Sequence, residues 1–277
     1  MPMETIISRD KTILLDRPRI MGVLNVTPDS FSDGGKFLNP EIAVRHARQM
    51  VEEGADIIDV GGESTRPGPQ GISVPEELER VMSVVERLVK EISVPISIDT
   101  QKPEVADEAL GIGVHMLNDI SGLRSPKMLT IAAKHNVPTI IMHMQGTPET
   151  MQKNPQYENV VEEIAEELCK QAAQAKAAGI DQVIVDPGIG FGKTLEHNLQ
   201  ILKHLKRFTD LGYPLMVGPS RKGFLGKILG TEVHDRLEGT LAAVVVSVMH
   251  GANIVRVHDV KECARALQIV HAIQTVL

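Results

Sequence analysis

The sequence predicts an α/β fold of the (β/α)8 TIM-barrel type, built as a single domain. Three observations lead to this prediction: the length of the chain, a repeated alternation of strand and helix patterns, and a polar residue at the end of each strand pattern. The chain has 277 residues, and a barrel of this type occupies about 250. No linker or shift in composition divides the sequence. An open doubly wound sheet is the alternative architecture.

Eight short runs rich in Ile and Val are predicted to be strands. Continuous apolar runs are typical of parallel strands that are buried on both faces. Several runs follow a glycine that suits the positive-φ position after a helix, as Gly54 does in EEGADIIDV. In chain order the predicted strands are Ile20–Leu24, Ile57–Val60, Ile96–Asp99, His115–Asn118, Thr139–His143, Val183–Asp186, Leu215–Gly218 and Ile254–His258.

Helical patterns lie between these runs, and the clearest spans Ser73 to Ile92. Its apolar residues recur at the 3.6-residue period of one helix face, from Leu78 and Val81 onward. Ser73 and Glu76 have the spacing of a capping box. Strand and helix alternate eight times at about 30 residues per unit, which favours a parallel barrel. The barrel is expected over residues 19–277, and residues 1–18 form an N-terminal extension, for which a hairpin across the barrel bottom is the candidate structure.

Composition excludes several classes of function. The net charge of -7 and the aromatic content of 3% argue against a nucleic-acid surface. The apolar stretch Leu241–Met249 is far shorter than the roughly 18 residues of a spanning helix, and the N-terminus lacks a signal-peptide pattern. Cys169 and Cys263 indicate a reducing cytoplasm rather than a disulfide framework. We therefore expect a cytoplasmic protein that acts on small molecules, with no membrane or nucleic-acid partner.

Polar residues follow the predicted strands at the end where barrel enzymes place their active sites. A single polar strand end can simply be exposed to solvent, but a barrel brings all of these ends to one mouth. The residues concerned are Asn25, Asp59, Asp99, Asn118, His143, Asp186, Ser220, Lys222, Arg256 and His258. The sequence therefore predicts an active site formed by this set.

Basic residues near the last two strands predict an anion site. Arg221 and Lys222 directly follow the seventh run, where barrels commonly bind phosphate. Arg256 and His258 alternate along the eighth run and so point to the same side. A buried arginine needs an anionic partner. That partner is either a ligand or, as the structural alternative, the carboxylate of Asp59 or Asp99.

Three loops could approach a ligand. NVTPDSFSDGG, residues 25–35, is either an exposed loop or a lid. GGESTRPG, residues 61–68, carries Arg66, which can reach an anion. DPGIGFGK, residues 186–193, has three glycines that permit close backbone approach, but neither P-loop nor dinucleotide spacing. Zinc spacing and a nucleophile elbow at Ser220 are both missing, which argues against zinc and serine hydrolysis.

Seven segments, in order from about residue 20 to 262, resemble dihydropteroate synthase. They are MGVLNVTPDSFSDGG, IIDVGGESTRPG, ISIDT, LNDISG, DPGIGFGKT, GPSRKGFLG and VRVHDV. The resemblance implies a transferase of folate biosynthesis that condenses 6-hydroxymethyl-7,8-dihydropterin diphosphate with 4-aminobenzoate, giving 7,8-dihydropteroate and diphosphate. It also implies a TIM barrel, a homodimer, a requirement for Mg²⁺, and inhibition by sulfonamides, which mimic 4-aminobenzoate.

The resemblance also implies a role for each matching residue. The pterin would be held by Asp99, Asn118, Asp186 and Lys222, and Met142 and Gly218 are further substrate-binding residues. The diphosphate would be bound by Thr65, Arg256 and His258. Asn25 would contact the metal, and Asp33 would assist the metal or stabilise developing positive charge. The aminobenzoate would be enclosed by Phe31, Arg66, Pro67 and Ser220. The residues implied in catalysis are Asp33, Arg66, Lys222 and Arg256.

The pterin assignment is chemically reasonable, because a pterin presents a ring N–H beside an amino group and a carboxylate accepts from both. Asp186 is the residue to which we assign this role. Two alternatives remain: a pterin-binding methyltransferase module of corrinoid-dependent enzymes, and a pterin or phosphate binder without activity. The STRPG loop and the SRK segment favour the synthase over the first, and Asp33, Thr65 and Arg66 argue against the second.

Overall fold

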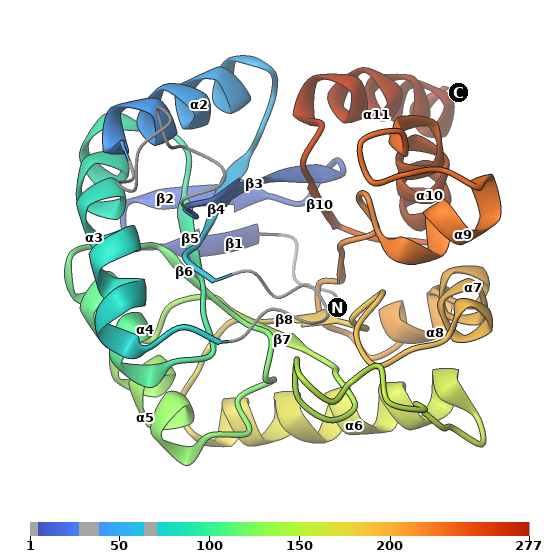
Figure 1. Ribbon diagram of the computed structural model, residues 1–277, viewed down its shortest axis with the longest axis horizontal. Helices are drawn as coiled ribbons and strands as arrows, with labels where there is room; N and C mark the ends of the chain where they lie inside the picture. The colour runs from blue at the N-terminus through green and yellow to red at the C-terminus, as the bar shows by residue number, and fades with distance from the viewer. Residues whose placement is uncertain (1–4, 28–38, 64–70, 277) are drawn as a thin grey trace.

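Eight parallel strands surround a central axis in the computed structural model, which describes residues 5–27, 39–63 and 71–276 (Figure 1). Each strand pairs with the next in the order β8-β7-β6-β5-β4-β3-β10-β9, and a bridge between Val185 and Leu215 joins β8 to β9. The predicted barrel is therefore confirmed. The strands are β3 (Arg19–Asn25), β4 (Ile57–Gly61), β5 (Ile96–Asp99), β6 (Met116–Asp119), β7 (Thr139–Met142), β8 (Val183–Asp186), β9 (Met216–Val217) and β10 (Ile254–Val257).

Helices cover the outside of the barrel, so that the strands are buried on both faces (Figure 1). This arrangement explains why the strand sequences are apolar without alternation. The helices are α2 (Pro40–Glu52), α3 (Val74–Glu91), α4 (Pro103–Gly111), α5 (Pro126–His135), α6 (Val160–Ala177), α7 (Leu195–Lys203), α8 (Lys206–Thr209), α9 (Gly223–Leu229), α10 (Leu237–Met249) and α11 (Val260–Thr275). No helix within the described residues is long and apolar enough to span a membrane.

The helix predicted from Ser73 to Ile92 is confirmed as α3, with those two residues as its caps. The Ser73 side chain accepts from the backbone N–H of Glu76, which is one half of the predicted capping box. The Glu76 carboxylate accepts instead from Arg80, 2.7 Å away. Predicted face residues such as Val81 and Leu88 are fully buried against the barrel.

Four glycines that precede strands have the positive φ that the sequence predicts. Their φ values are 108° at Gly54, 111° at Gly113, 97° at Gly179 and 100° at Gly251. Only glycine adopts this backbone conformation without steric strain. These residues therefore end a helix and turn the chain into the following strand.

Two strand predictions are displaced. The run predicted at Leu215–Gly218 forms only the two-residue strand β9, because Leu215 contributes a single bridge to β8. The run predicted at His115–Asn118 is shifted by one residue, and Asp119 ends β6. His115 lies just before that strand, where its ring Nδ1 accepts from the backbone N–H of Ile96 at 3.2 Å.

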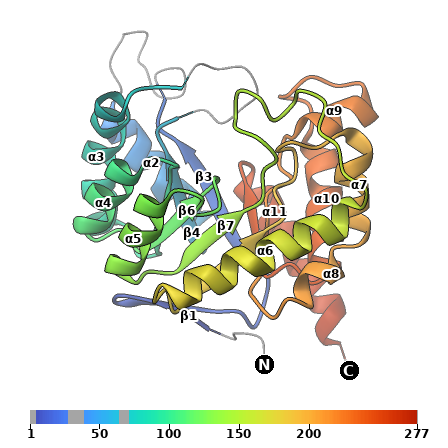
Figure 2. The same ribbon diagram turned by 90° about the horizontal axis from the view of Figure 1, so that it is seen from below.

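A hairpin of β1 (Thr5–Ser8) and β2 (Lys11–Leu14) lies across the end of the barrel at which the strands begin (Figure 2). Its two buried isoleucines, Ile6 and Ile13, pack onto apolar residues near the starts of seven strands. These residues are Met21, Ile57, Met116, Ile140, Ile184, Met216 and Ile254. The hairpin closes this end, which leaves the opposite end for a ligand.

Candidate functional site

A cavity of about 560 Å³ opens where the strands end and continues inward into a narrow pocket of about 20 Å³. The two spaces adjoin, because they share five lining residues. The shared residues are Asp99, Phe191, Gly218, Lys222 and Arg256. The site therefore has a deep inner part on the barrel axis and a wider outer part, and we refer to these as the inner pocket and the outer cavity.

The inner pocket brings together the residues that the resemblance assigns to the pterin. Asp99, Met142 and Asp186 end β5, β7 and β8, and Asn118 lies one residue before the end of β6. All four are at least nine-tenths buried. Gly218 and Lys222, from the segment after β9, complete the set. Parallel strands bring their carboxyl ends to one mouth, which is why residues so far apart in sequence meet here.

Arg256 holds two carboxylates at the base of the site. Its Nε donates to Asp59 Oδ2 and its Nη2 to Asp99 Oδ2, both at 2.6 Å. Asn118 Nδ2 donates to the same Asp59 oxygen at 2.9 Å. The ion pair considered as the structural alternative for Arg256 therefore exists, and Arg256 also lines both parts of the cavity.

One cation between two carboxylates leaves this cluster ready to accept hydrogen bonds. Burial raises the pKa of Asp99 to about 7, with Arg256 acting against burial and Asp59 adding to it. Oδ1 of Asp99 and Oδ1 of Asp59 are both buried without a hydrogen-bond partner in the described part of the chain. Because a buried acceptor without a partner is unfavourable, a ligand that donates N–H groups would stabilise the inner pocket.

Asp186 provides a second carboxylate. Its Oδ1 accepts from the backbone N–H of Gly188 at 2.7 Å. Burial raises the pKa of Asp186 to about 6, against the opposing effects of that hydrogen bond and of Lys222. The carboxylate is therefore ionised at neutral pH and can accept from paired donors.

The side chains of Lys222 and Phe191 stack where the inner pocket meets the outer cavity. The Lys222 Nζ is 4.0 Å from the centre of the Phe191 ring, a cation–π contact. Both residues line the inner pocket and the outer cavity. A flat aromatic surface at the pocket wall suits a flat heterocycle.

The outer cavity is strongly basic, although the whole chain is acidic. Among the described residues, six basic side chains line it, against the one carboxylate of Asp99. The six are Lys193, Arg221, Lys222, Lys227, Arg236 and Arg256. Arg221 is partly neutralised, because its Nε donates to Asp259 Oδ2 at 3.0 Å. The field still favours an anion, as the basic residues of the sequence predict.

Ser220 and His258 form a hydrogen-bonded pair in this outer cavity. Ser220 Oγ accepts from the backbone N–H of His258 at 3.2 Å and lies 3.0 Å from its ring Nδ1. Burial, followed by the nearby charge of Arg256, lowers the pKa of His258 to about 3. His258 is therefore neutral in the ligand-free protein at neutral pH, and its ring can donate a hydrogen bond to an anion.

Five residues to which the resemblance gives a role lie outside the described residues. They are Phe31, Asp33, Thr65, Arg66 and Pro67. Asn25, which is assigned to the metal, ends β3 and lines the outer cavity. Within residues 5–27, 39–63 and 71–276, no three His, Cys, Asp or Glu residues are arranged to hold a metal ion.

Sequence reasoning missed several residues of the site. Phe191 and Lys193 belong to DPGIGFGK, where only the glycines were considered, and the lone aromatic residue between them was the available signal. Arg236 follows no strand, and it reaches the cavity from the segment before α10. Asp59 was predicted as a strand-end residue of the site and as a possible ion-pair partner, but its hydrogen bond from Asn118 was not foreseen.

Known proteins resemble this chain over almost its whole length. Residues 21–258 match the family described as pterin binding enzyme. The dihydropteroate synthase of Escherichia coli (strain K12) is 48% identical over 260 residues, which cover 93% of this chain and 92% of the relative. The Yersinia pestis dihydropteroate synthase solved with a sulfonamide drug has a TM-score of 0.93 and 44% identity, covering 98% and 100%. The Xanthomonas albilineans enzyme solved with 7,8-dihydropteroate has a TM-score of 0.90 and 42% identity, covering 99% and 100%.

Proposed function

The chain belongs to the pterin-binding enzyme family, as a dihydropteroate synthase, and we propose how its residues divide the work of that reaction. The enzyme is a transferase that condenses 6-hydroxymethyl-7,8-dihydropterin diphosphate with 4-aminobenzoate, giving 7,8-dihydropteroate and diphosphate. One observation carries the proposal: a single cavity has carboxylates at its deep end and basic residues at its mouth.

The inner pocket holds the pterin. Asp186 accepts from the ring N–H and the adjacent amino group, because an ionised carboxylate takes paired donors. Asn118 both donates and accepts, and Lys222 donates to the ring carbonyl. Met142 and Gly218 line the same pocket. The free oxygen of Asp99 provides a further acceptor.

The outer cavity holds the diphosphate. Arg256 and Lys222 lie where the two spaces join, and His258 adds a neutral donor. Arg256 is shared between the pterin-side carboxylates and the outer cavity, so it couples the two ends of the substrate. Thr65 is proposed as a further diphosphate contact. Phe31, Arg66, Pro67 and Ser220 are proposed to enclose the aminobenzoate.

Magnesium is proposed as the metal, and the donor set suits it. Mg²⁺ in proteins commonly keeps several waters and binds through substrate phosphates with only one or two protein oxygens. Asn25 provides an amide oxygen at the cavity wall, and Asp33 is proposed to assist. When bound, the ion would offset the negative charge of the diphosphate.

The reaction needs no protein nucleophile. The bond from the pterin methylene to the diphosphate oxygen breaks, and its electron pair leaves with the diphosphate. The amine nitrogen of the second substrate then forms the new C–N bond and loses a proton. Asp99 and Asp186 stabilise the positive charge that develops on the pterin, while Arg256 and His258 stabilise the negative charge on the leaving group.

The direct test measures diphosphate release after mixing with both substrates and magnesium. We expect diphosphate and 7,8-dihydropteroate in equal amounts. Lys222→Met should lower kcat/KM by about a hundredfold or more, because a donor to the charged transition state is lost. Binding of the pterin without turnover would contradict the proposal and favour a binding protein.

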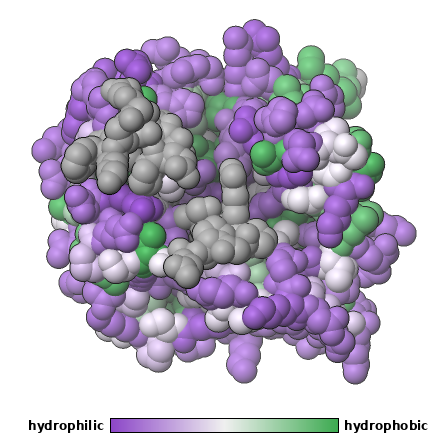
Figure 3. Space-filling model, viewed as in Figure 1, coloured by the Kyte–Doolittle hydropathy of each residue, from purple (hydrophilic) through white to green (hydrophobic). Residues whose placement is uncertain are grey.

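A homodimer is proposed from the apolar surface of α9, α10 and α11. Ile228, Met249, Ile269 and Ile273 are each more than half exposed. Figure 3 shows apolar side chains at the right edge of the molecule, where these helices lie. Helix α10 is apolar on most sides, which is typical of a buried helix. Light scattering should give twice the chain mass, and a monomer at micromolar concentration would contradict this.

We also expect the protein to be inhibited by sulfonamides and to be located in the cytoplasm. The Yersinia pestis relative was solved with a sulfonamide drug, so we expect sulfonamides to compete with 4-aminobenzoate here. Inhibition that does not weaken as 4-aminobenzoate is raised would contradict this expectation. Cys169 and Cys263 are both free, which agrees with a reducing compartment.

A further inference from the structure

The segment 186–193 begins at the last residue of β8. Three successive backbone carbonyls in this segment accept hydrogen bonds from side chains. Each of these carbonyls accepts one hydrogen bond, at 2.8 to 2.9 Å. The pairs are Gln152 Nε2 with Gly190 O, Lys193 Nζ with Phe191 O, and Tyr157 Oη with Gly192 O. Gln152 and Tyr157 come from the segment between β7 and α6. The loop that carries Asp186 and Phe191 is therefore held by its neighbour.

Lys193 is buried to an extent that is unusual for a lysine, with 3% of its surface exposed. Its Nζ lies 3.1 Å from His143 Nδ1 and 3.3 Å from the His143 carbonyl. Its hydrogen bonds therefore run to an imidazole and to two carbonyls, not to a carboxylate. Burial of a charge is unfavourable unless its hydrogen bonds are made, and here they all hold the two loops together.

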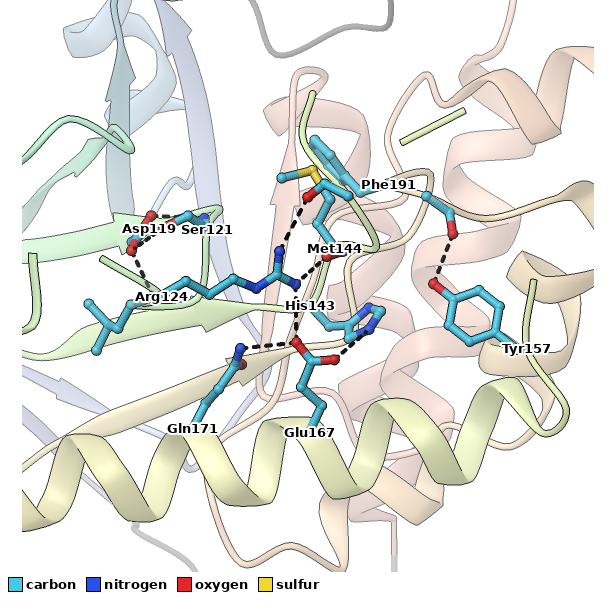
Figure 4. A network of polar contacts seen from close by, with 12 residues as sticks. Asp119, Ser121, Arg124, His143, Met144, Tyr157, Glu167, Gln171 and Phe191 are labelled. Atoms are coloured by element: carbon cyan, nitrogen blue, oxygen red, sulfur yellow. Dashed lines mark hydrogen bonds and ion pairs between the residues drawn. The ribbon is translucent and has the colours of Figure 1, made fainter. Parts of the chain in front are cut away.

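His143 connects these hydrogen bonds to helix α6 (Figure 4). His143 Nε2 lies 3.4 Å from Glu167 Oε2, and a ring proton on this nitrogen would face the carboxylate and leave Nδ1 to accept from Lys193 Nζ. Glu167 Oε1 accepts from Arg124 Nη2 at 3.1 Å, and Arg124 also donates to the carbonyl of Gly146 at 3.2 Å. The network thus joins the loops after β6, β7 and β8 to α6.

The two loops after β7 and β8 touch directly, so a shift in one must move the other. A Cβ at Gly188 would lie 2.0 Å from the His143 carbonyl oxygen. A Cβ at Gly192 would lie 2.7 Å from the Gln145 carbonyl oxygen. Closely packed groups transmit such displacements instead of absorbing them.

We propose that Lys193 is a positioning residue for the pterin: its ammonium ties the loop after β8 to His143 and thereby places Phe191 and Asp186 in the inner pocket. The proposal rests on the proposed function, because it concerns the same pocket. Lys193 acts through these two residues, since its donors are used by His143 and by the Phe191 carbonyl. Neither the reacting methylene nor the leaving group is its target.

The test replaces Lys193 by Met, which is unbranched and uncharged. Calorimetry with 6-hydroxymethyl-7,8-dihydropterin, which lacks the diphosphate and so does not report the loss of a basic residue from the outer cavity, should show about tenfold weaker binding, as expected from the lost hydrogen bonds. The KM for the pterin substrate should rise while kcat at saturation changes less. Lys170→Met, on the exposed face of α6, is the matched control and should bind as the wild type does.

A second variant, Tyr157→Phe, removes one neutral bond from the same loop and introduces no buried charge. It should weaken pterin binding by about threefold, and it decides the question if Lys193→Met does not fold. A purely structural role would lower Tm and leave the Kd of the folded variants unchanged, which would overturn the inference. If the wild type itself does not bind the pterin, the proposed function fails instead.

Discussion

The buried carboxylate of Asp186 lowers the stability of the free protein while it prepares the pocket for a ligand. Burial raises its pKa from the ordinary value of 3.8 to about 6. Between these values the folded state holds a proton that the unfolded chain has released. Stability therefore falls as the pH rises through this window and stays lower at neutral pH.

Asp186→Asn should therefore stabilise the protein and weaken the binding of substrate. The amide oxygen can still accept from Gly188, and no charge is buried. We expect the free energy of unfolding at pH 7 to rise by about 1–3 kcal/mol and the pterin diphosphate to bind about a hundredfold more weakly. Urea unfolding and calorimetry measure the two effects, with the exposed Asp210→Asn as control. Unchanged binding would refute the assignment of Asp186.

The same pKa predicts how pterin binding depends on pH. Binding needs the ionised carboxylate of Asp186, so affinity should fall roughly tenfold per pH unit below about pH 6, because protonation competes with the ligand. Asp99, with a pKa of about 7, titrates in the same pocket. Comparing wild type with Asp186→Asn, using 6-hydroxymethyl-7,8-dihydropterin, which lacks the diphosphate, separates the two groups. A constant affinity from pH 5 to 8 would show that Asp186 does not contact the ring.

At the scale of elements, strand positions could be predicted because a buried parallel strand imposes a composition on the sequence. Continuous Ile and Val runs such as Ile57–Val60 leave few alternatives once Gly54 ends the preceding helix. Strand ends were less predictable, since hydrogen bonding to a neighbour decides them. The two-residue β9 and the bridge from Leu215 to Val185 depend on how the last strands close the barrel. This closure is a tertiary property that a local sequence pattern does not encode.

The described site residues were predictable where they end strands, because the barrel brings strand ends together whatever their loops do. Asp99, Asn118 and Asp186 belong to this class. Phe191 and Lys193 were missed because their importance arises from contact between two loops. Such contacts are tertiary, and neither periodicity nor spacing encodes them. The sequence therefore predicted the bottom of the pocket better than the loops that fix its shape.

Gly188→Ala tests the packing of the loops after β7 and β8. Gly188 has a φ of 69°, and an added Cβ would lie 2.0 Å from the His143 carbonyl oxygen. We expect a loss of about 2–4 kcal/mol in the free energy of unfolding, because the clash adds to backbone strain. Chemical denaturation provides the measurement.

Gly212→Ala is the matched control for this substitution. Gly212 has a φ of 80°, but an added Cβ would meet nothing within 4 Å. It should cost only about 1 kcal/mol, which is the backbone term alone. Equal losses of unfolding free energy in Gly188→Ala and Gly212→Ala would mean that the loops after β7 and β8 can move apart. The rigid contact on which the role of Lys193 depends would then be wrong.

At the scale of the whole molecule, the outer cavity is basic although the chain as a whole is acidic. The chain carries a net charge of -7, whereas six basic residues line the outer cavity. An acidic exterior repels anions in general, and a basic cavity concentrates attraction at one place. This arrangement suits a substrate that carries a diphosphate, because the anion is favoured only where the pterin pocket also lies.

Residues that stabilise the fold and residues of the proposed active site lie at opposite ends of the barrel. The hairpin of β1 and β2 closes the end at which the strands start, and the cavity opens where they finish (Figure 2). Ile6 of the hairpin is fully buried in the bottom cluster. Met216 of this bottom cluster also lines the inner pocket, and the other members of the cluster lie nearer the starts of the strands.

Ile6→Ala should therefore destabilise the fold without changing the reaction. Removing the buried side chain should lower the free energy of unfolding by about 2–4 kcal/mol. The kcat and both KM values, measured well below Tm, should stay within about twofold of wild type because the active site lies at the opposite end. Ile7→Ala, on the exposed face of the same strand, should change neither property. A reduced kcat in fully folded Ile6→Ala would mean that the hairpin acts on the pocket through Met216, and the two ends would then be coupled.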